Sequence, residues 1–340
     1  MSHKLFLFAF LILLVAGCAA DAQESSGLEV DGDSSLPMKA LIVDGQNKYH
    51  PAWPKTTQMM KQYLEETGLF SVDIERTKYL LDGGQEKDWP LNDGVERENL
   101  KKPKTDPDFA PNFSQYQLVI VNSGNAAAPW PKETEDAFEK YMSEGGGLFV
   151  VHAADNCFPH WKEFNLMTGL GGWGGRTEKD GPYVYLNEKE ELVRDTSAGS
   201  GGDHGPQHQF EVVIREEHPI TNGLPTAWMH AQDELYQTLR GPAENMTVLA
   251  TAYSDKEFKG TQRHEPMAMV IDYKKGRTFH IALGHADYSF ECVAMITLIK
   301  RGCEWAATGK VTQTEVPVDF PGRDKPSKRK FEIKEVATSE

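Results

Sequence analysis

The chain has 340 residues, which is long enough for one large domain or two small ones with a sizeable hydrophobic core. Its 36 basic and 51 acidic residues give a formal net charge of −15. This balance argues against general binding to nucleic acid, whose phosphates attract surfaces rich in Lys and Arg. It is compatible with a neutral small molecule such as a sugar.

The first 18 residues predict an export signal. Lys4 supplies a positive start, and the apolar run from Leu5 to Val15 is too short to span a bilayer comfortably. The segment Val15-Ala16-Gly17-Cys18 resembles a bacterial lipobox, in which Cys18 would be lipidated and become the mature N-terminus. An ordinary signal peptide that happens to contain a cysteine is the alternative. Because neither residue after Cys18 is Asp, inner-membrane retention is not signalled. We expect an anchor on the periplasmic side of the cell envelope, in the outer membrane, or secretion.

Composition divides the rest of the chain into three parts. Residues 19–36 are rich in Ser, Gly, Asp and Glu, which predicts a disordered linker. Residues 37–310 are expected to form the folded domain, and residues 311–340 predict a polar, loosely attached tail. The three remaining cysteines show no CxxC spacing and cannot all pair, which favours buried thiols; they are Cys157, Cys292 and Cys303.

Strand and helix patterns alternate in the first half of the domain. Strands are expected over residues 38–43, 70–74, 117–121 and 148–151, helices over 53–66 and 131–143, and a polar loop insertion over 82–112. This alternation predicts a parallel sheet with helices on both faces. Ligands gather at the carboxyl ends of such strands.

The second half has shorter strand patterns separated by turns. Strands are expected over residues 183–186, 210–214, 247–251, 267–271 and 278–283, with a hairpin turn over 274–277 and a closing helix over 290–306. These patterns predict that antiparallel strands extend the parallel sheet.

Several histidines follow a strand or lie in a glycine loop before one: His50, His152, His204, His208 and His285. If the parallel strands run alike, the loops after the first and fourth strands face one edge, and distant histidines converge there. Neutral imidazoles suit proton transfer or metal ligation. The spacing of His204 and His208 resembles a ligand pair, but Gly205 and Pro206 disfavour a helix there, so this metal signal is weak. A divalent ion on His50, His152, His204 or His208 is one hypothesis, and hydrogen-bonding histidines without metal are the other.

Two acidic residues, Asp233 and Glu234, precede an apolar residue and a tyrosine, and they are candidate catalytic acids or, alternatively, helix or turn caps. Asp155 lies three residues beyond His152 and is placed to orient its ring. We take Glu265, just before a strand, as a candidate for substrate binding with His50, His204 and His208.

Aromatic side chains supply possible sugar-stacking surfaces. Trp161, Phe164, Trp173 and Trp228 could stack on sugar faces, with Trp161 taken as the candidate, but aromatic residues at these spacings are also typical of a core.

Several common catalytic motifs are missing from the sequence. The glycine-rich run over residues 169–175 neither follows a strand nor ends in Lys-Ser, so it does not indicate a phosphate-binding loop. There is no G-x-S-x-G segment for Ser-His-Asp catalysis. A nucleophilic cysteine would be expected directly after the strand over 148–151, where His152 stands, and Cys157 comes too late.

Four segments together resemble the ThuA-like (trehalose-utilisation) family: Gly145–Ala154, His218–Pro225, Asp233–Tyr236 and Gly276–His285. The resemblance covers about residues 38–308, which makes residues 37–310 a ThuA-like domain. It implies a three-layer, flavodoxin-like sheet similar to that of class I glutamine amidotransferases. Gln117 and the segment over 278–280 depart from the family pattern in ways that look structural.

The same resemblance bears on activity. In class I glutamine amidotransferases the nucleophilic cysteine follows the strand equivalent to residues 148–151, and this chain has none there, so glutaminase activity is not expected. The family is linked to the use of trehalose and related disaccharides through oxidised, 3-keto sugars.

Three hypotheses for function follow. The first is an exported enzyme that acts on a disaccharide or 3-keto-glycoside by acid–base chemistry, as a lyase, hydrolase or isomerase, because a keto group acidifies the neighbouring C–H. In it His152 and His285 are candidate bases, Glu234 or Asp233 is an acid or hydroxyl ligand, and His50 contacts substrate or metal. The second is a lipid-anchored sugar-binding module without catalysis, and the third is a structural or partner-binding relic of the amidotransferase fold.

Overall fold

The computed structural model describes residue 1 and residues 36–334. The predicted signal peptide with Cys18 and nearly all of the predicted linker lie outside these described residues. From Pro37 onward the chain is one compact unit. None of the helices described is both long enough and apolar enough to cross a membrane.

The first half of the unit forms the parallel part of a large sheet. Its strands are β1 (Met38–Asp44), β2 (Phe70–Arg76), β5 (Leu118–Asn122), β6 (Gly147–Val151) and β15 (Gly276–Ile281). They lie side by side in the order β2-β1-β5-β6-β15, all parallel. Counted along the chain, this order is 2-1-3-4-5, that of a flavodoxin-like sheet. The predicted fold class is confirmed.

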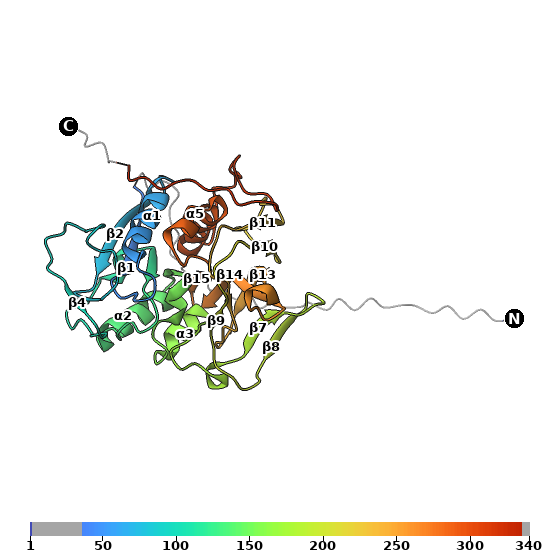
Figure 1. The fold of residues 1–340 in the computed structure, drawn as a ribbon, viewed down its shortest axis with the longest axis horizontal. Coiled ribbons are helices and arrows are strands. Elements are labelled where there is room, and N and C mark those ends of the chain that lie inside the picture. The colour runs from blue at the N-terminus through green and yellow to red at the C-terminus, as the bar shows by residue number, and fades with distance from the viewer. Residues whose placement is uncertain (2–35, 335–340) are drawn as a thin grey trace. The chain divides into compact units, whose positions relative to one another are not determined.

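Helices cover both faces of these strands (Figure 1). Successive side chains of a strand point to opposite faces, so in β1 Ala40 and Ile42 join one buried cluster while Leu41 and Val43 join another. The first cluster packs against α1 (Trp53–Glu65) and α5 (Val293–Thr308), and the second against α2 (Lys132–Ser143) and α3 (Lys162–Thr168). Strands buried on both faces explain the continuous apolar runs in the sequence.

Antiparallel strands extend the sheet beyond β15, as predicted. They are β14 (His264–Tyr273), β13 (Met246–Tyr253), β10 (Glu211–Ile214) and β11 (Ala227–Met229), with β7 (Tyr183–Leu186) and β8 (Leu192–Asp195) attached to β14. The predicted hairpin joins β14 to β15. Sequence patterns missed β11, which has three residues, and β8, which is largely exposed.

Short elements change the predicted outline in three places. The polar insertion contains β4 (Glu98–Leu100), which pairs with β3 (Tyr79–Leu81). The two-residue strands β9 (Asp203–His204) and β12 (Tyr236–Gln237) pair with each other, so His204 lies opposite Tyr236. The closing helix is divided into α4 (Asp287–Phe290) and α5, because Cys292 is extended between them.

The polar C-terminal segment over residues 311–334 has no helix or strand, yet it is not loosely attached as predicted. Backbone N–H groups of Met229 and Val293 donate to the carbonyls of Gly322 and Ser327 at 2.8 and 3.0 Å. Phe331 is 8% exposed and packs against Tyr63 of α1. A polar composition gave no sign of these backbone contacts.

The cysteine prediction is confirmed for the described residues. Cys157, Cys292 and Cys303 are all buried and unpaired.

Candidate functional site

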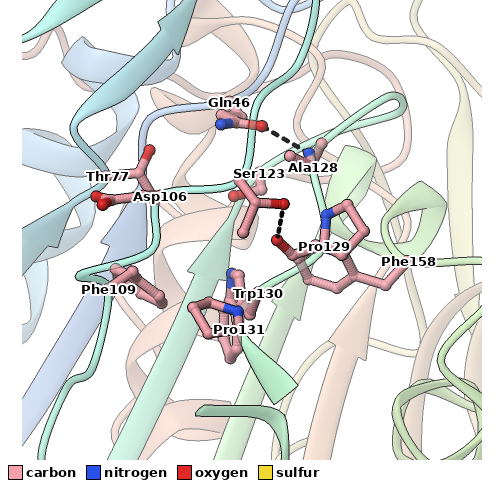
Figure 2. A pocket seen from close by; sticks show the side chains of 12 residues that line it. Gln46, Thr77, Asp106, Phe109, Ser123, Ala128, Pro129, Trp130, Pro131 and Phe158 are labelled. Carbon is pink, nitrogen blue, oxygen red and sulfur yellow. Dashed lines mark hydrogen bonds between the residues drawn. The ribbon is translucent and has the colours of Figure 1, made fainter. Parts of the chain in front are cut away.

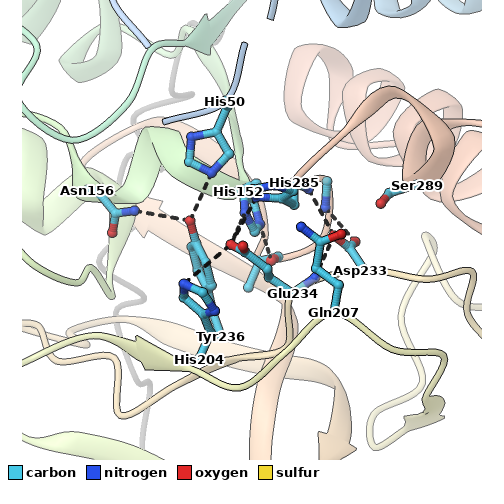
Figure 3. A network of polar contacts seen from close by, with 12 residues as sticks. His50, His152, Asn156, His204, Gln207, Asp233, Glu234, Tyr236, His285 and Ser289 are labelled. Atoms are coloured by element: carbon cyan, nitrogen blue, oxygen red, sulfur yellow. Dashed lines mark hydrogen bonds and ion pairs between the residues drawn. The ribbon is translucent and has the colours of Figure 1, made fainter. Parts of the chain in front are cut away.

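Polar residues from distant parts of the chain meet at the carboxyl edge of the parallel strands. His50 lies in the loop after β1, Asn125 in the loop after β5, His152 directly after β6, and His285 in the loop after β15. This edge lies beside the point where the strand order reverses, which is where open α/β sheets bind ligands. The predicted convergence of His50 and His152 is therefore found, and Figure 3 shows it.

His152 begins the tight turn over His152–Asn156 with a left-handed backbone, φ 44°. A residue other than glycine pays about 1–3 kcal/mol for such a conformation, and strain of this kind concentrates at functional sites. The ring is 2% exposed and stacks on Tyr236 with 3.9 Å between ring centroids. Its Nδ1 lies 2.7 Å from the carbonyl of Ala282, which fixes Nδ1–H as the donor and leaves Nε2 facing the site.

His50 is held from both sides. Its Nδ1 lies 2.7 Å from Oδ1 of Asn47, and its Nε2 lies 3.4 Å from the hydroxyl of Tyr236. The ring centroid of His50 is 5.0 Å from that of His152 and 4.8 Å from that of His285. Three imidazoles therefore surround one small space.

Glu234 supplies the carboxylate at the centre of these rings. Its Oε2 lies 2.9 Å from Nδ1 of His285, 3.7 Å from Nε2 of His152 and 3.7 Å from Nε2 of His204. Burial would raise the pKa of Glu234, but the contacts with His152 and His285 outweigh it and hold this pKa well below its usual range. Glu234 is therefore an anionic group at neutral pH.

The histidines respond differently to the same surroundings. Burial, and then the neighbouring His152 and His285, hold the pKa of His50 well below its ordinary value. Burial also acts to lower the pKa of His152, but Glu234 and Asp233 outweigh it and raise the pKa. The buried site therefore favours positive charge near Glu234 and resists a proton on His50.

Asp233 lies behind this cluster and is fully buried. Its carboxylate accepts N–H groups from Glu234, Gly284 and His285 at 2.8–2.9 Å, and it contacts Nε2 of His230 at 2.9 Å. Gly284 adopts φ 119°, a conformation that favours glycine and directs successive N–H groups at the carboxylate. The structure thus shows Asp233, predicted as catalytic, as a group that positions the loop carrying His285.

A cavity of about 400 Å³ opens in front of the cluster, within the usual size of small-molecule sites. Its lining consists of Tyr49, His50, Asn125, Asn156, Trp173, His204, Glu234, Tyr236 and His285. His152 lies deeper, behind this surface. Sequence reasoning did not single out Tyr49, Asn125 or Asn156, although all three follow strands of the parallel sheet. Tyr236 belongs to the Asp233–Tyr236 motif that indicated the family.

Three predicted substrate-binding residues lie outside this cavity. His208 stacks on Phe258 with 3.8 Å between centroids, and its Nδ1 contacts the carbonyl of Pro206. Trp161 packs in the aromatic cluster under α2, where its Nε1–H donates to Glu139 at 2.8 Å. Glu265 is buried and accepts hydrogen bonds from Thr261 and Arg263, each at 2.7 Å.

The predicted partnership between Asp155 and His152 is also wrong. Asp155 faces Nε2 of His280 at 3.4 Å, and the carbonyl of Ala282 takes the place that Asp155 was expected to fill. Among the tryptophans weighed for sugar stacking, Trp173 lines the cavity.

A set of donors suited to a metal ion lies at the base of the cavity. His50, His152, Glu234 and His285 each offer one ligand atom, and these atoms all lie within 4.8 Å of one another. Histidine nitrogens with a carboxylate oxygen are a donor set that Zn²⁺ uses. Of the four ligands predicted from sequence, His50 and His152 belong to this set, His204 approaches Glu234 from the rim, and His208 points elsewhere.

A second hollow lies below the loops that follow β1 and β5 (Figure 2). It measures about 10 Å³, so it has room for about one water molecule. Gln46 closes it, donating from Nε2 to Tyr79 and Lys104 and accepting the N–H of Ala128 at 2.6 Å. This hollow is a packed loop junction without the space for a substrate.

The fold and site define an α/β protein with a polar small-molecule cavity at the carboxyl edge of a flavodoxin-like sheet. Residues 93–306 match the ThuA family, described as trehalose utilisation, and the chain belongs to this family.

A ThuA-like protein of Parabacteroides merdae is similar at 42% identity and a TM-score of 0.75, over 86% of this chain and 98% of that one. A ThuA-like protein of Bacteroides uniformis is similar at 19% identity and a TM-score of 0.50, over 82% and 95%. No curated protein matches the chain. Family membership is consistent with a role in carbohydrate utilisation.

Proposed function

We propose that this chain is an enzyme of carbohydrate utilisation that acts on a 3-keto-glycoside or related disaccharide by acid–base chemistry. The observation that carries the proposal is the convergence of His50, His204, His285 and Glu234 on the lining of one 400 Å³ cavity. Trp173 forms part of the same wall and offers an apolar face beside these polar groups, with its ring centroid 4.8 Å from that of the buried Tyr236. Such a wall suits a sugar ring, which presents C–H groups on its faces and hydroxyls at its edge.

His204 is the residue to which we assign proton abstraction. Its side chain is 37% exposed, so substrate can reach it, whereas His152 is shielded behind the cavity surface. Its Nδ1 lies 2.8 Å from the carbonyl of Gly205, which makes Nδ1–H a donor and leaves Nε2 to accept a proton. Glu234, 3.7 Å from that Nε2, stabilises the imidazolium that results.

The reaction consistent with this arrangement is elimination beside a keto group. The base removes the proton from the carbon between the keto carbon and the anomeric carbon, and the electron pair moves to the keto oxygen. When the pair returns, the glycosidic C–O bond breaks and the leaving oxygen takes the proton from the base. No covalent enzyme intermediate and no oxidant are needed, which agrees with the absence of a nucleophilic cysteine at this turn.

The test is product analysis by mass spectrometry on a panel of native and 3-keto disaccharides. Turnover of a keto-disaccharide by the wild type, and its loss in His204→Ala, is the expected result. His208→Ala is the matched control, because His208 belongs to the same loop but stacks on Phe258 away from the cavity. Undiminished turnover in His204→Ala would show that His204 is not the base.

A sugar-binding protein without catalysis is the second candidate, favoured by the ring of Trp173 in the cavity lining. Saturable binding of an unmodified disaccharide, with no product from any member of the panel after long incubation, would replace the enzymatic proposal with this one.

We also propose that the protein is exported and anchored through a lipid on Cys18. The sequence Val15-Ala16-Gly17-Cys18 after an apolar run supports this. Mass spectrometry of the mature N-terminus should find acylated Cys18, and Cys18→Ser should move the protein out of the membrane fraction. An unmodified Cys18 in membrane-free protein would contradict the anchor.

A further inference from the structure

We propose that His50, His152, Glu234 and His285 bind one divalent cation of the first transition row, with Zn²⁺ as the representative ion. The cation site follows from the arrangement of these side chains alone. Only its role in turnover, described below, rests on the proposed sugar chemistry.

The main observation is that hydrogen-bond acceptors from four side chains converge, and the hydroxyl of Tyr236 approaches one of them, Nε2 of His50, at 3.4 Å. Since Nδ1–H of His50 donates to Asn47 and Nδ1–H of His152 donates to Ala282, the inward Nε2 atom of each ring carries a lone pair when the ring is neutral. The carboxylate of Glu234 adds further lone pairs between them. Such a group of acceptors is repulsive unless a cation lies among them.

Unpartnered atoms mark the same position. Nε2 of His152 and Nδ1 of His285 are buried and have no hydrogen-bond partner among the described residues. His285 Nδ1 lies 2.9 Å from Oε2 of Glu234, but the two are not aligned for a hydrogen bond. Buried polar atoms without partners are uncommon in folded proteins and call for an explanation such as a bound ion.

Protons are a poor substitute for a metal here. Placing a proton on each of three rings would bring three positive charges together, with ring centroids 4.8–5.8 Å apart, against a single carboxylate. One divalent cation satisfies all four ligand atoms at once while the rings stay neutral.

The spacing fits a small coordination sphere. Metal–ligand bonds of about 2.1 Å in a tetrahedron place neighbouring ligand atoms about 3.4 Å apart. Two of the observed separations, 2.9 Å from Glu234 to His285 and 3.7 Å from Glu234 to His152, lie on either side of this value. All four ligand atoms lie within 4.8 Å of one another, so small side-chain rotations complete the sphere.

The surrounding contacts are those of a metal site. Ligating histidines commonly donate their second N–H to a carbonyl or carboxylate, which fixes the ring and its tautomer. His50 does so through Asn47 and His152 through the carbonyl of Ala282. Asp233 fixes the backbone of both Glu234 and His285, so the remaining two ligands are also held in place.

A cation at this position would complement the proposed elimination. It lies next to the cavity through Glu234, His50 and His285, where it can hold the keto oxygen and stabilise the negative charge that forms there. His204 stays outside the ligand set and keeps its role as the base. The buried cluster thus binds the cation, and the exposed His204 abstracts the proton.

The test is metal binding to the full chain after removal of metal with a chelator, measured without sugar by calorimetry and by metal analysis after gel filtration. We expect one equivalent of Zn²⁺ per chain in the wild type and in His208→Ala. Glu234→Gln and His285→Ala should each weaken binding at least 100-fold. Mg²⁺ and Ca²⁺, which prefer oxygen ligands, should not bind at this site.

Asn47→Ala supplies a second variant that leaves every ligand in place. Loss of its contact with His50 should weaken Zn²⁺ binding about 10- to 100-fold. Circular dichroism of each variant separates a lost ligand from a lost fold. Absence of stoichiometric binding in the wild type, or equal binding in the wild type, Glu234→Gln and His285→Ala, would overturn the proposed site.

Failure of this proposal and failure of the proposed function give different results. Stoichiometric Zn²⁺ binding with no turnover of any sugar supports the metal site and removes the enzymatic proposal. Turnover of a keto-glycoside by protein that takes up no Zn²⁺ when the ion is added supports the enzyme and overturns the metal site.

Discussion

The carboxylate of Asp233 accepts the backbone N–H of His285 at 2.9 Å, although 52 residues separate them in the chain. The same carboxylate accepts the N–H groups of Gly284 and Glu234. One buried side chain therefore sets the distance between two residues of the site, Glu234 and His285, that come from different segments. Asp233 itself is fully buried and does not line the cavity, so its contacts with the site are these backbone hydrogen bonds.

Asp233→Asn tests this positioning role. The amide would turn an NH₂ group towards backbone N–H groups or leave donors unpaired, so we expect a loss of about 3 kcal/mol in the free energy of unfolding. Urea denaturation measures it. Asp93→Asn is the control, because the exposed Asp93 pairs with the partly buried Arg97 at the protein surface, and it should cost less than about 1 kcal/mol. Equal stability of Asp233→Asn and wild type would contradict the structural role.

Trp173 and Trp161 provide a second prediction, because both were weighed from sequence as sugar-stacking residues. Trp173→Ala removes part of the cavity wall, and we expect the KM for sugar to rise roughly tenfold, equivalent to about 1.4 kcal/mol. Trp161→Ala leaves the cavity intact but creates a void in an aromatic core, so it should lower the free energy of unfolding by about 3–5 kcal/mol. Steady-state kinetics and urea denaturation of both variants check this. A larger rise in KM for Trp161→Ala would reverse the assignment.

Much of the scaffold was predictable because its pattern is local. The apolar run over residues 148–151 is buried on both faces, and this alone indicated a parallel strand ending at His152. The histidines that follow the strands indicated the ligand-binding edge of the sheet, because their position after a strand can also be read from the local sequence. The order of strands along a parallel sheet then brought His50 and His152 together.

The rest depended on contacts between distant segments. Whether Asp233 or Glu234 faces the cavity cannot be read from adjacent acidic residues. It is decided by the loop at Gly284, because the backbone N–H of Gly284 donates a hydrogen bond to the carboxylate of Asp233 and holds it away from the cavity. His208 and His204 are likewise alike in sequence, and the pairing of β9 with β12 separates them by placing His204 opposite Tyr236.

The motif His218–Pro225 yields a third prediction, which concerns pH. Nδ1 of His218 accepts the N–H of Ile220 at 3.3 Å, which requires an unprotonated Nδ1. Burial lowers the pKa of His218, and the charge of Asp272 opposes this shift without cancelling it. The imidazole of His218 therefore binds a proton more tightly in the unfolded chain than in the folded one. The contribution of His218 to the free energy of unfolding is complete above its unfolded pKa of about 6.5, and it is lost as pH falls through its folded pKa.

His218→Gln removes this titration. The difference in unfolding free energy between wild type and His218→Gln should shrink as pH falls from about 7.5 to about 5.5. Urea denaturation at matched ionic strength gives the two curves. A difference that stays constant, or grows on acidification, would show that His218 does not titrate as proposed.

The C-terminal segment gives a fourth prediction. Phe331 fills a space beside Tyr63 and Trp89, so Phe331→Ala should lower the free energy of unfolding by about 3 kcal/mol. Val318→Ala in the same segment is the matched control, because Val318 is 107% exposed and its truncation should cost less than about 0.5 kcal/mol. Thermal or urea unfolding distinguishes them. Equal, small effects would mean that the segment packs weakly after all.

The proposed cation gives the last prediction, which concerns stability in the absence of sugar. A ligand that binds only the folded chain stabilises it by about 2.7 kcal/mol at a free concentration 100 times its Kd. Zn²⁺ should therefore raise the Tm of the wild type and of His208→Ala, and a chelator should reverse the rise. Glu234→Gln, which replaces a charged ligand by a neutral amide of similar size, should show no rise at the same concentration. Differential scanning calorimetry of the three proteins, each with and without Zn²⁺, measures the shifts, and a rise in Glu234→Gln equal to that of the wild type would place the stabilising ion elsewhere.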